Sequence, residues 1–328
     1  MKFKKKLAVF LMLNAVLFFA FILTFVLDSD NRRNPSFAWL DSSLLVMVDR
    51  IEIEGSRGNS VLVRRNDVWY FSTGRELFPV RQGRVEDLLT ALTLRDVYTL
   101  RAVSAEARER LGLTEGAASR ILVRGGVGLP LLDLRIGTGG VFGGEVYFQI
   151  AGRNEIFSGE DRFTLFTESR PQSWFELRLF PPETARHEIF GAARMMPAGT
   201  GVSAIQQVEV YFSGNRERTY TLRRSGGGWV FPGNENAVLD TPRVEAWLRS
   251  LMDAEGEDFA FSAPDDIEGN VIIWFGDGTI RTIQAGRLEE NHHAGLSRRV
   301  MASDSSFVYV FSEWAFNRLF PESAFFLK

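Results

Sequence analysis

The sequence predicts an α+β protein with two tandem duplicated units of mostly antiparallel strands, each with one or two packed helices, preceded by one N-terminal transmembrane helix. Two observations support this prediction. Apolar residues spaced i, i+3, i+4, i+7 mark one buried helical face at residues 85–92, and the same spacing returns at 244–251. A long apolar run also lies close to the N-terminus. Because anchors that recur in the same order indicate a copied folding unit, we expect the two units to share one plan.

The apolar run Leu7–Leu27 predicts an uncleaved membrane anchor. A helix of this length rises roughly 30 Å, which is the thickness of the hydrocarbon core. A cleavable signal peptide has a shorter apolar region, of about 7–15 residues, that ends at small residues. This run instead ends in Phe25-Val26-Leu27. The lysines of residues 1–6 place that tail in the cytoplasm. We therefore expect a single-pass protein of the cytoplasmic (inner) membrane whose body lies on the extracytoplasmic or periplasmic side.

Breaks in the hydrophobic pattern divide the rest of the chain. We expect a polar tether at residues 28–45, a first unit at 46–182, a bridge at 183–203 and a second unit at 204–328. The strands expected in the first unit are residues 48–54, 61–65, 68–71, 121–124, 131–136, 146–150 and 155–157. The expected helices are residues 84–94, residues 105–110 with Ser104 as the N-cap, and a closing helix at 174–179.

The second unit repeats this plan in fewer residues. Thr241-Pro242 predicts the start of its helix, because a capping residue precedes a proline at the first helical position. The expected strands are residues 207–212, 218–224, 229–231, 271–275, 279–283 and 307–311, and the closing helix is residues 314–319.

Recurring tryptophan and arginine residues strengthen the prediction of a repeat. Large rings at matching positions of two small units favour a packing role, although exposed aromatic rings outside a cell can also bind sugars. Adjacent arginines on a strand point to opposite faces, so the two side chains cannot form one anion-binding fork. The matching sets are Arg64-Arg65 and Trp69 with Arg223-Arg224 and Trp229, and Trp174–Pro181 with Trp314–Pro321.

Composition excludes several classes of function. The chain has no cysteine, which rules out disulfides, thiolate metal sites and thiol nucleophiles. Hydrophobic content of 45% with 24% charged residues is typical of a globular body. The net charge is −3 although residues 1–6 are rich in lysine, so the body alone is more acidic than the whole chain. An acidic body disfavours nucleic acid as a partner.

The motifs that resemble functional sites lack the required spacing. The glycines of residues 137–144 fail the dinucleotide fingerprint because Phe142 occupies a glycine position and a strand, not a helix, follows. His292-His293 lies near Glu289 and Glu290 but has no partner motif for a metal, and His187 is the remaining histidine. Asp265-Asp266 has no informative spacing. We therefore predict no catalytic, cofactor-binding or metal-binding residues and no cofactor.

Short motifs of the first unit resemble those of a known family, domain of unknown function 4340. They are Glu109–Leu113 leading into a strand, then Leu134–Gly137 and Val146–Phe148. The resemblance covers residues 46–181, and a degenerate second copy follows that lacks the Leu-Gly-Leu element. The resemblance implies an anchored extracytoplasmic protein, in some cases associated with gliding-motility-type ABC transporters. The family supplies no catalytic residues.

These observations favour a non-enzymatic, membrane-anchored extracytoplasmic accessory or scaffold protein, with an ABC-type transport or envelope complex as its expected partner. The alternative is a module that binds a glycan or another envelope ligand through exposed aromatic rings such as Trp39 or Trp274. A hydrolase that uses two acidic residues is the least favoured reading, because no pair of carboxylates shows a characteristic spacing.

Overall fold

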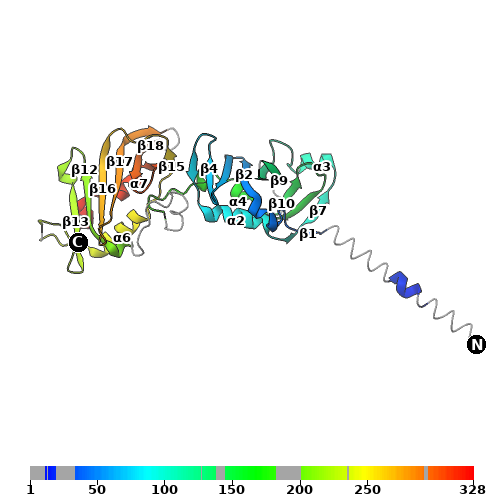
Figure 1. The fold of residues 1–328 in the computed structure, drawn as a ribbon, viewed down its shortest axis with the longest axis horizontal. Helices are drawn as coiled ribbons and strands as arrows, with labels where there is room; N and C mark the ends of the chain where they lie inside the picture. The colour runs from blue at the N-terminus through cyan, green and yellow to red at the C-terminus, as the bar shows by residue number, and fades with distance from the viewer. Residues whose placement is uncertain are drawn as a thin grey trace, which may run out of the picture. The chain divides into compact units, whose positions relative to one another are not determined.

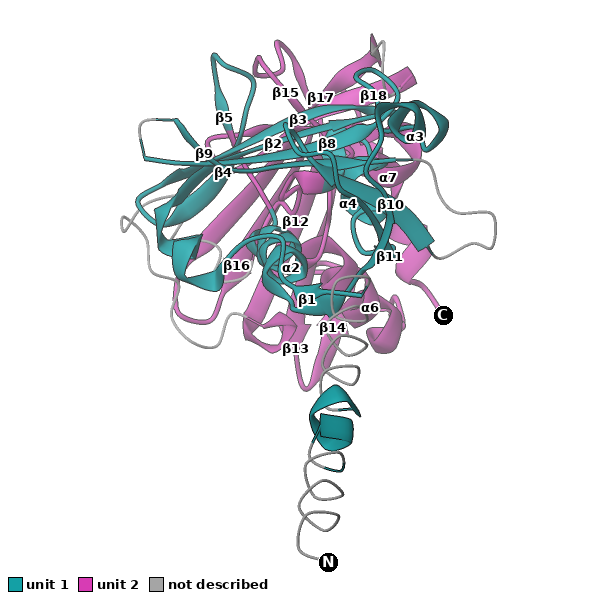
Figure 2. Ribbon diagram, turned by 90° about the vertical axis from the view of Figure 1, so that its right-hand side faces the viewer, with its two compact units in different colours: residues 1–77, 81–173 teal, residues 78–80, 174–328 magenta. Residues whose placement is uncertain are grey.

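The computed structural model describes residues 12, 14–19, 34–126, 128–137, 145–181, 201–234, 236–291 and 295–328. The chain forms two compact units (Figure 2). The first comprises residues 1–77 and 81–173, and the second comprises 78–80 and 174–328. Each unit is mostly antiparallel sheet with a few helices, which confirms the α+β prediction.

The predicted anchor is described only in part. Met12 and residues 14–19 are helical, and the other residues of Leu7–Leu27 lie outside the described residues, as does the tail 1–6. Within the part of the chain that is described, no helix combines the length and the apolar character needed to cross a bilayer.

The first unit begins with the short strand β1 (Ser36–Phe37) and the 3₁₀ turn η1 (Ser42–Met47). Its further strands are β2 (Val48–Gly55), β3 (Gly58–Arg65), β4 (Val68–Ser72), β6 (Asp96–Val97), β7 (Thr99–Ala102), β8 (Ser119–Gly125), β9 (Leu129–Ile136), β10 (Glu145–Ile150) and β11 (Ile156–Glu160). Its helices are α2 (Gln82–Thr93), α3 (Ala105–Arg110) and α4 (Thr164–Thr167), followed by the 3₁₀ turn η2 (Pro171–Trp174). The division between the units falls inside β5 (Leu77–Pro79).

The strands of the second unit are β12 (Ile205–Phe212), β13 (Tyr220–Ser225), β14 (Gly228–Val230), β15 (Asp258–Ala260), β16 (Ile267–Phe275), β17 (Ile280–Asn291), β18 (Gly295–Ala302) and β19 (Val308–Ser312). Its helices are α6 (Thr241–Met252) and α7 (Glu313–Leu319), with 3₁₀ turns η3 (Val202–Ala204), η4 (Arg216–Arg218) and η5 (Ser323–Phe326). Buried and exposed side chains alternate along β16, as expected for a strand with one covered face.

The two main sheets have the same strand order. In the first unit it is β5-β4-β3-β2-β8-β9-β10-β11-β7, and in the second it is β14-β13-β12-β16-β17-β18-β19-β15, so the orders match once the additional edge strand β5 of the first unit is set aside. In both, the first strands form a meander, a helix follows, a later strand takes the opposite edge of the sheet, and four strands fill the space between. The pairings in the part of the order that the two sheets share are all antiparallel.

One amphipathic helix of three turns packs in each unit, α2 in the first and α6 in the second (Figure 1), and the shorter helices α4 and α7 also contact the sheets. The helix α2 buries Val85, Leu88 and Leu92, and α6 buries the residues Val244, Trp247, Leu248 and Leu251. The i, i+3, i+4, i+7 spacing predicts the whole of the α6 face, and all of the α2 face except its i+4 residue, Leu89, which is only partly buried. The α6 cap is Asp240, whose side chain accepts from the Arg243 backbone N–H, and the helix therefore starts one residue earlier than predicted. The predicted Ser104 cap of α3 is confirmed, because its hydroxyl accepts from the Ala107 N–H.

The predicted closing helix at residues 174–179 is wrong. Trp174 ends the 3₁₀ turn η2, and the next residues form two isolated antiparallel β-bridges, Phe175 with Val80 and Arg178 with Glu255. The segment belongs to the second unit. Its backbone bonds with two other segments of that unit: the Glu176 N–H donates to the Pro79 carbonyl at 2.9 Å, and the Leu177 carbonyl accepts from Gly256 at 2.9 Å. Because these backbone N–H and carbonyl groups bond with other segments, they cannot form the hydrogen bonds of a helix within residues 174–179. Trp174 is fully buried whereas Trp314 on α7 is 69% exposed, so the predicted match of these two residues also fails.

A buried arginine fixes the end of this segment to the second sheet. Arg281 on β17 is 1% exposed, and its Nε lies 2.9 Å from a carboxylate oxygen of Asp304. Its guanidinium carbon lies 4.9 Å from the ring centre of Phe180 and 5.3 Å from that of Phe275. A cation over aromatic faces is attracted by the ring quadrupole, most strongly where water is excluded. Phe180 is therefore held by electrostatics as well as by burial.

Because α2 and α6 occupy the same position in their units, we expect truncation of a core leucine in either helix to destabilise its own unit by a similar amount. Leu92→Ala and Leu251→Ala each remove a fully buried side chain, and we expect each to lower the free energy of unfolding of its own unit by about 2–5 kcal/mol. Hydrogen exchange followed by mass spectrometry measures this separately for peptides of each unit. Glu86→Ala and Arg249→Ala, on the exposed faces of the same helices, serve as controls. Equal loss of protection in both units from either leucine variant would contradict independent cores.

Candidate functional site

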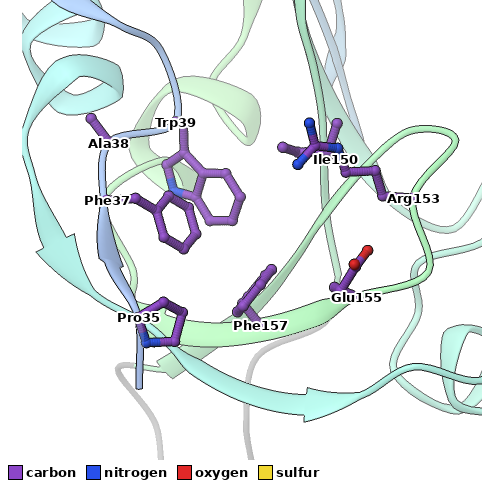
Figure 3. A pocket seen from close by; sticks show the side chains of 8 residues that line it. All are labelled: Pro35, Phe37, Ala38, Trp39, Ile150, Arg153, Glu155 and Phe157. Carbon is purple, nitrogen blue, oxygen red and sulfur yellow. The ribbon is translucent and has the colours of Figure 1, made fainter. Parts of the chain in front are cut away.

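A pocket of about 430 Å³ opens in the first unit where the described body begins (Figure 3). One wall comes from the segment that leads into the unit, and the facing wall comes from the turn that joins β10 to β11. The pocket is lined by Pro35, Phe37, Ala38, Trp39, Ile150, Arg153, Glu155 and Phe157.

Residues 34–41, which we call the leading segment, are bound to the first unit along their length. Ser36 and Phe37 pair with β6 as an antiparallel strand, and the Tyr98 N–H donates to the Pro35 carbonyl at 3.0 Å. At the other end the Leu40 N–H donates to the carbonyl of Leu92, in the last turn of α2, at 3.0 Å. The predicted tether at 28–45 is therefore ordered structure from Asn34 onward.

Aromatic rings fasten the leading segment to the sheet. The ring of Trp39 lies 4.8 Å from that of Tyr98 and 5.3 Å from that of Phe148, measured between ring centres. Phe37 contacts Phe157 at 5.3 Å in an edge-to-face arrangement. Such pairs contribute about 0.5–1.5 kcal/mol each beyond the burial of their surface. The cluster makes one wall of the pocket rigid, since Trp39 is only 6% exposed.

A glycine makes room for this cluster. A Cβ atom at Gly159 on β11 would lie 2.6 Å from a ring carbon of Tyr98, so only glycine lets that ring lie against the strand. Burial raises the pKa of the Tyr98 hydroxyl above its ordinary value, and the phenol is therefore neutral at physiological pH. Tyr98 supports Trp39 and Phe37 from behind and does not line the pocket.

The two charged groups of the pocket lie on a turn whose backbone is fixed by a side-chain hydrogen bond. Arg153 and Glu155 stand opposite Phe37 and Trp39 across the pocket (Figure 3). Gln149, which is buried, donates through its side-chain amide to the Arg153 carbonyl at 2.8 Å. A buried amide that uses its donor in this way fixes the backbone of the turn, and thereby the position from which both charged side chains extend.

The lining has the composition of a ligand-binding site. Aromatic and aliphatic walls with a few polar groups at the mouth are the usual form of a small-molecule site. The lining includes one cation, Arg153, and one carboxylate, Glu155. A ligand with a flat apolar face could stack on Phe37 or Trp39 and place a polar group near Arg153.

The tryptophans that the sequence analysis names differ in burial and in their contacts. Trp39 and Trp274 were predicted to be exposed, and this prediction is wrong: Trp39 is 6% exposed, although it lines the pocket, and Trp274 is half-buried on β16. Trp69 and Trp229 are both buried, which confirms their packing role. Trp314 was expected to pack but is largely exposed, and the Arg318 guanidinium carbon lies 4.8 Å from its ring centre.

The arginine pairs match with a shift of one residue. Arg64 stands opposite Trp69 across β3 and β4, and Arg224 stands opposite Trp229 across β13 and β14. Arg64 forms an ion pair with Asp67 at 2.9 Å. Arg224 donates to the Ile205 carbonyl at 3.1 Å and lies over the Trp229 ring. Arg64 and Arg224, which lie opposite the matching tryptophans, therefore both have a structural role in their units.

The remaining sequence candidates do not form a site in the described structure. Residues 138–144 lie outside the described residues, but β9 and β10 on either side pair as an antiparallel hairpin, so a strand follows the glycines as predicted. His187 and His292-His293 also lie outside the described residues. Asp265 pairs with Arg299 at 3.3 Å, and Asp266 pairs with Arg287 at 3.4 Å. The described residues contain no cluster of three metal-ligating side chains.

The sequence analysis named Trp39 as a possible binding residue, but it assigned the leading segment to a polar tether and did not identify Phe37 as part of the site. The run Phe37-Ala38-Trp39-Leu40 within the expected tether was the available signal, because four apolar residues in a polar stretch need burial. Arg153 and Glu155 carried no such signal, since their place at the pocket depends on a turn between strands.

Comparison with known proteins identifies one related family. A family model described as a domain of unknown function (DUF4340) matches residues 69–269. No curated protein and no solved structure matches the chain.

The close approach at Gly159 gives a test of the aromatic cluster. Gly159→Ala forces the Tyr98 ring away from β11, and we expect a loss of about 1–3 kcal/mol in the stability of the first unit together with a changed near-ultraviolet circular dichroism signal. Gly126→Ala is the matched control, because nothing lies within 4 Å of its added methyl group. Denaturant unfolding in which both variants behave alike would show that the Tyr98 ring is not packed as described.

Proposed function

The chain belongs to the domain of unknown function 4340 family, and from this membership we propose that it is a non-enzymatic, membrane-anchored extracytoplasmic scaffold or accessory subunit, for example of a complex built around an ABC-type transporter. The anchor in this proposal is the apolar run Leu7–Leu27, which places the two units outside the cytoplasm.

The attachment of the leading segment is the observation that carries the proposal. Only residues 28–33 separate the end of the apolar run from the first described residue of the body, Asn34. A fully extended stretch of six residues spans about 20 Å. From Asn34 onward the chain is bound to the first unit by backbone hydrogen bonds and aromatic contacts. The first unit is thus held at the membrane surface, which is what a subunit that positions partners at a transporter requires.

We also propose that the two units are copies of one ancestral module. Three features support this origin: the strand order that the two sheets share apart from β5, the position of α2 and α6 after the opening meander of each unit, and the shared register of Arg64 with Trp69 and Arg224 with Trp229. Two related β-rich units offer a partner more surface than one, without any need for a catalytic centre.

The acidic pair suggested by the sequence is used in ion pairs. Asp265 pairs with Arg299, and Asp266 pairs with Arg287. Exposed pairs of this kind contribute about 0–1 kcal/mol each and serve solubility as much as stability.

Co-purification from native membranes tests the scaffold proposal. We expect the full chain to remain in the membrane after an alkaline wash and to recover integral membrane proteins after mild cross-linking. The control is the same body exported behind a cleavable signal peptide in place of Leu7–Leu27, which should lose those partners. Recovery of the full chain alone, as a monomer in the membrane fraction, would contradict the proposal.

The aromatic pocket favours a second candidate function, an extracytoplasmic module that binds a glycan or another envelope ligand. Its support is the geometry at Phe37 and Trp39, where an aromatic wall faces Arg153 and Glu155. We expect envelope glycan fragments to change the emission of Trp39 on titration, because the ring lines the pocket.

The variant Arg153→Ala should weaken this binding by about 1.5–3 kcal/mol if the guanidinium donates to a charged ligand group. Arg135→Ala, on β9 in the same unit and outside the pocket lining, is the control. Titration with no response in the unaltered chain, or equal weakening by both variants, would reject the pocket as the binding site.

A further inference from the structure

The turn η1 is an ordered apolar segment that the body does not bury. Its sequence is Ser-Ser-Leu-Leu-Val-Met, and none of its six residues is buried. It is nevertheless fixed at both ends, since Leu40 before it and Val48 after it are each 1% exposed. The Asp41 carboxylate caps it by accepting from the Ser43 N–H at 2.8 Å. The chain thus holds Val46, 80% exposed, in a defined position facing solvent.

The tip of the β8–β9 hairpin extends this apolar surface. Val48 pairs with Gly125, and Gly125 pairs in turn with Leu129, which is 55% exposed. A Cβ atom at Gly125 would lie 2.6 Å from the Met47 carbonyl oxygen and 2.9 Å from a methyl carbon of Leu131. The glycine therefore lets η1 and the hairpin close against each other. We call Leu44–Met47 together with Leu129–Leu131 the apolar lip.

An apolar surface of this kind implies a covering partner. Single exposed leucines or valines are ordinary on soluble proteins. Several adjacent ones, held by a cap and by a close approach at glycine, are typical of interaction sites, because covering apolar surface is favourable in proportion to its area. Nothing in the first unit covers the lip, since Val46, Met47 and Leu129 all stay exposed in the described structure.

We propose that the apolar lip inserts into the outer surface of the lipid bilayer that the anchor spans, and this inference rests on the proposed function. The length of chain between the two supports the bilayer as the occupant. Fourteen residues lie between Leu27 and Ser42, a reach of about 50 Å when fully extended and less here because residues 34–41 are folded onto the unit.

Tethering makes a small lip sufficient. Apolar side chains that enter the boundary between headgroups and acyl chains bind in proportion to the area they bury, and a few residues alone bind weakly. Because the anchor keeps the lip near the bilayer, its docking becomes an intramolecular step with a high effective concentration. The lip and the anchor together would then fix the orientation of the first unit, which a single flexible attachment cannot do.

Depth-dependent quenching tests this inference. The chain has no cysteine, so Val46→Cys, Leu129→Cys and the control Ile280→Cys each give one labelling site for an environment-sensitive fluorophore in the full chain. Ile280 is apolar, 51% exposed and in the second unit. In phosphatidylcholine vesicles we expect a blue-shifted emission, quenching by brominated lipid and protection from aqueous iodide at positions 46 and 129, and none of these at position 280.

Flotation of the same vesicles separates this inference from the proposed function. If the full chain floats with the vesicles but positions 46 and 129 are quenched by iodide like position 280, the lip inference is overturned and the anchor stands. Protection from iodide without quenching by brominated lipid also overturns it, because a protein surface would then be the cover. If the chain does not float, the anchor and the lip inference both fail.

Discussion

Each antiparallel sheet of this protein has an apolar face that helices must cover, and much of the fold follows from that constraint. The first long helix of each unit comes after the opening meander, so the chain crosses the sheet before it continues and a later strand takes the opposite edge. The helix α2 buries Val85, Leu88 and Leu92, and α6 buries a matching set, so both helices contribute to the core of their unit. Even the leading segment depends on this arrangement, because its last backbone hydrogen bond is accepted by Leu92 in the final turn of α2.

The leading segment joins three properties of the first unit in one short stretch. It contributes rings to the aromatic cluster, it forms one wall of the pocket, and it is the part of the body nearest in sequence to the proposed anchor. A change in its packing would therefore alter the stability of the first unit and the shape of the pocket together, and in the proposed arrangement also the link to the anchor. Phe37 and Trp39 are the residues through which these properties are coupled, since both contact the cluster and line the pocket.

The surface features fit a protein that positions other molecules. Its pocket has aromatic walls with a single cation and a single carboxylate, a composition suited to holding a ligand. Its apolar lip is fixed by Asp41 and by the close approach at Gly125, yet remains uncovered. In the proposed arrangement the lip and the anchor are two contacts with one bilayer, and the second unit, which continues the same plan of strands, remains available to a partner.

The sequence alone determined the α+β class, the covering faces of both helices and most strands, because hydrophobic periodicity records which side of an element is buried. The cap at Ser104 and the packing of Trp69 and Trp229 were predictable for the same local reason. Only the tertiary structure decided that residues 175–178 form isolated β-bridges in place of a helix, that Trp314 is exposed and that Arg153 reaches a pocket. In each case hydrogen bonds or contacts with residues distant in the chain outweigh the local pattern, and no periodicity within the segment encodes its distant partners.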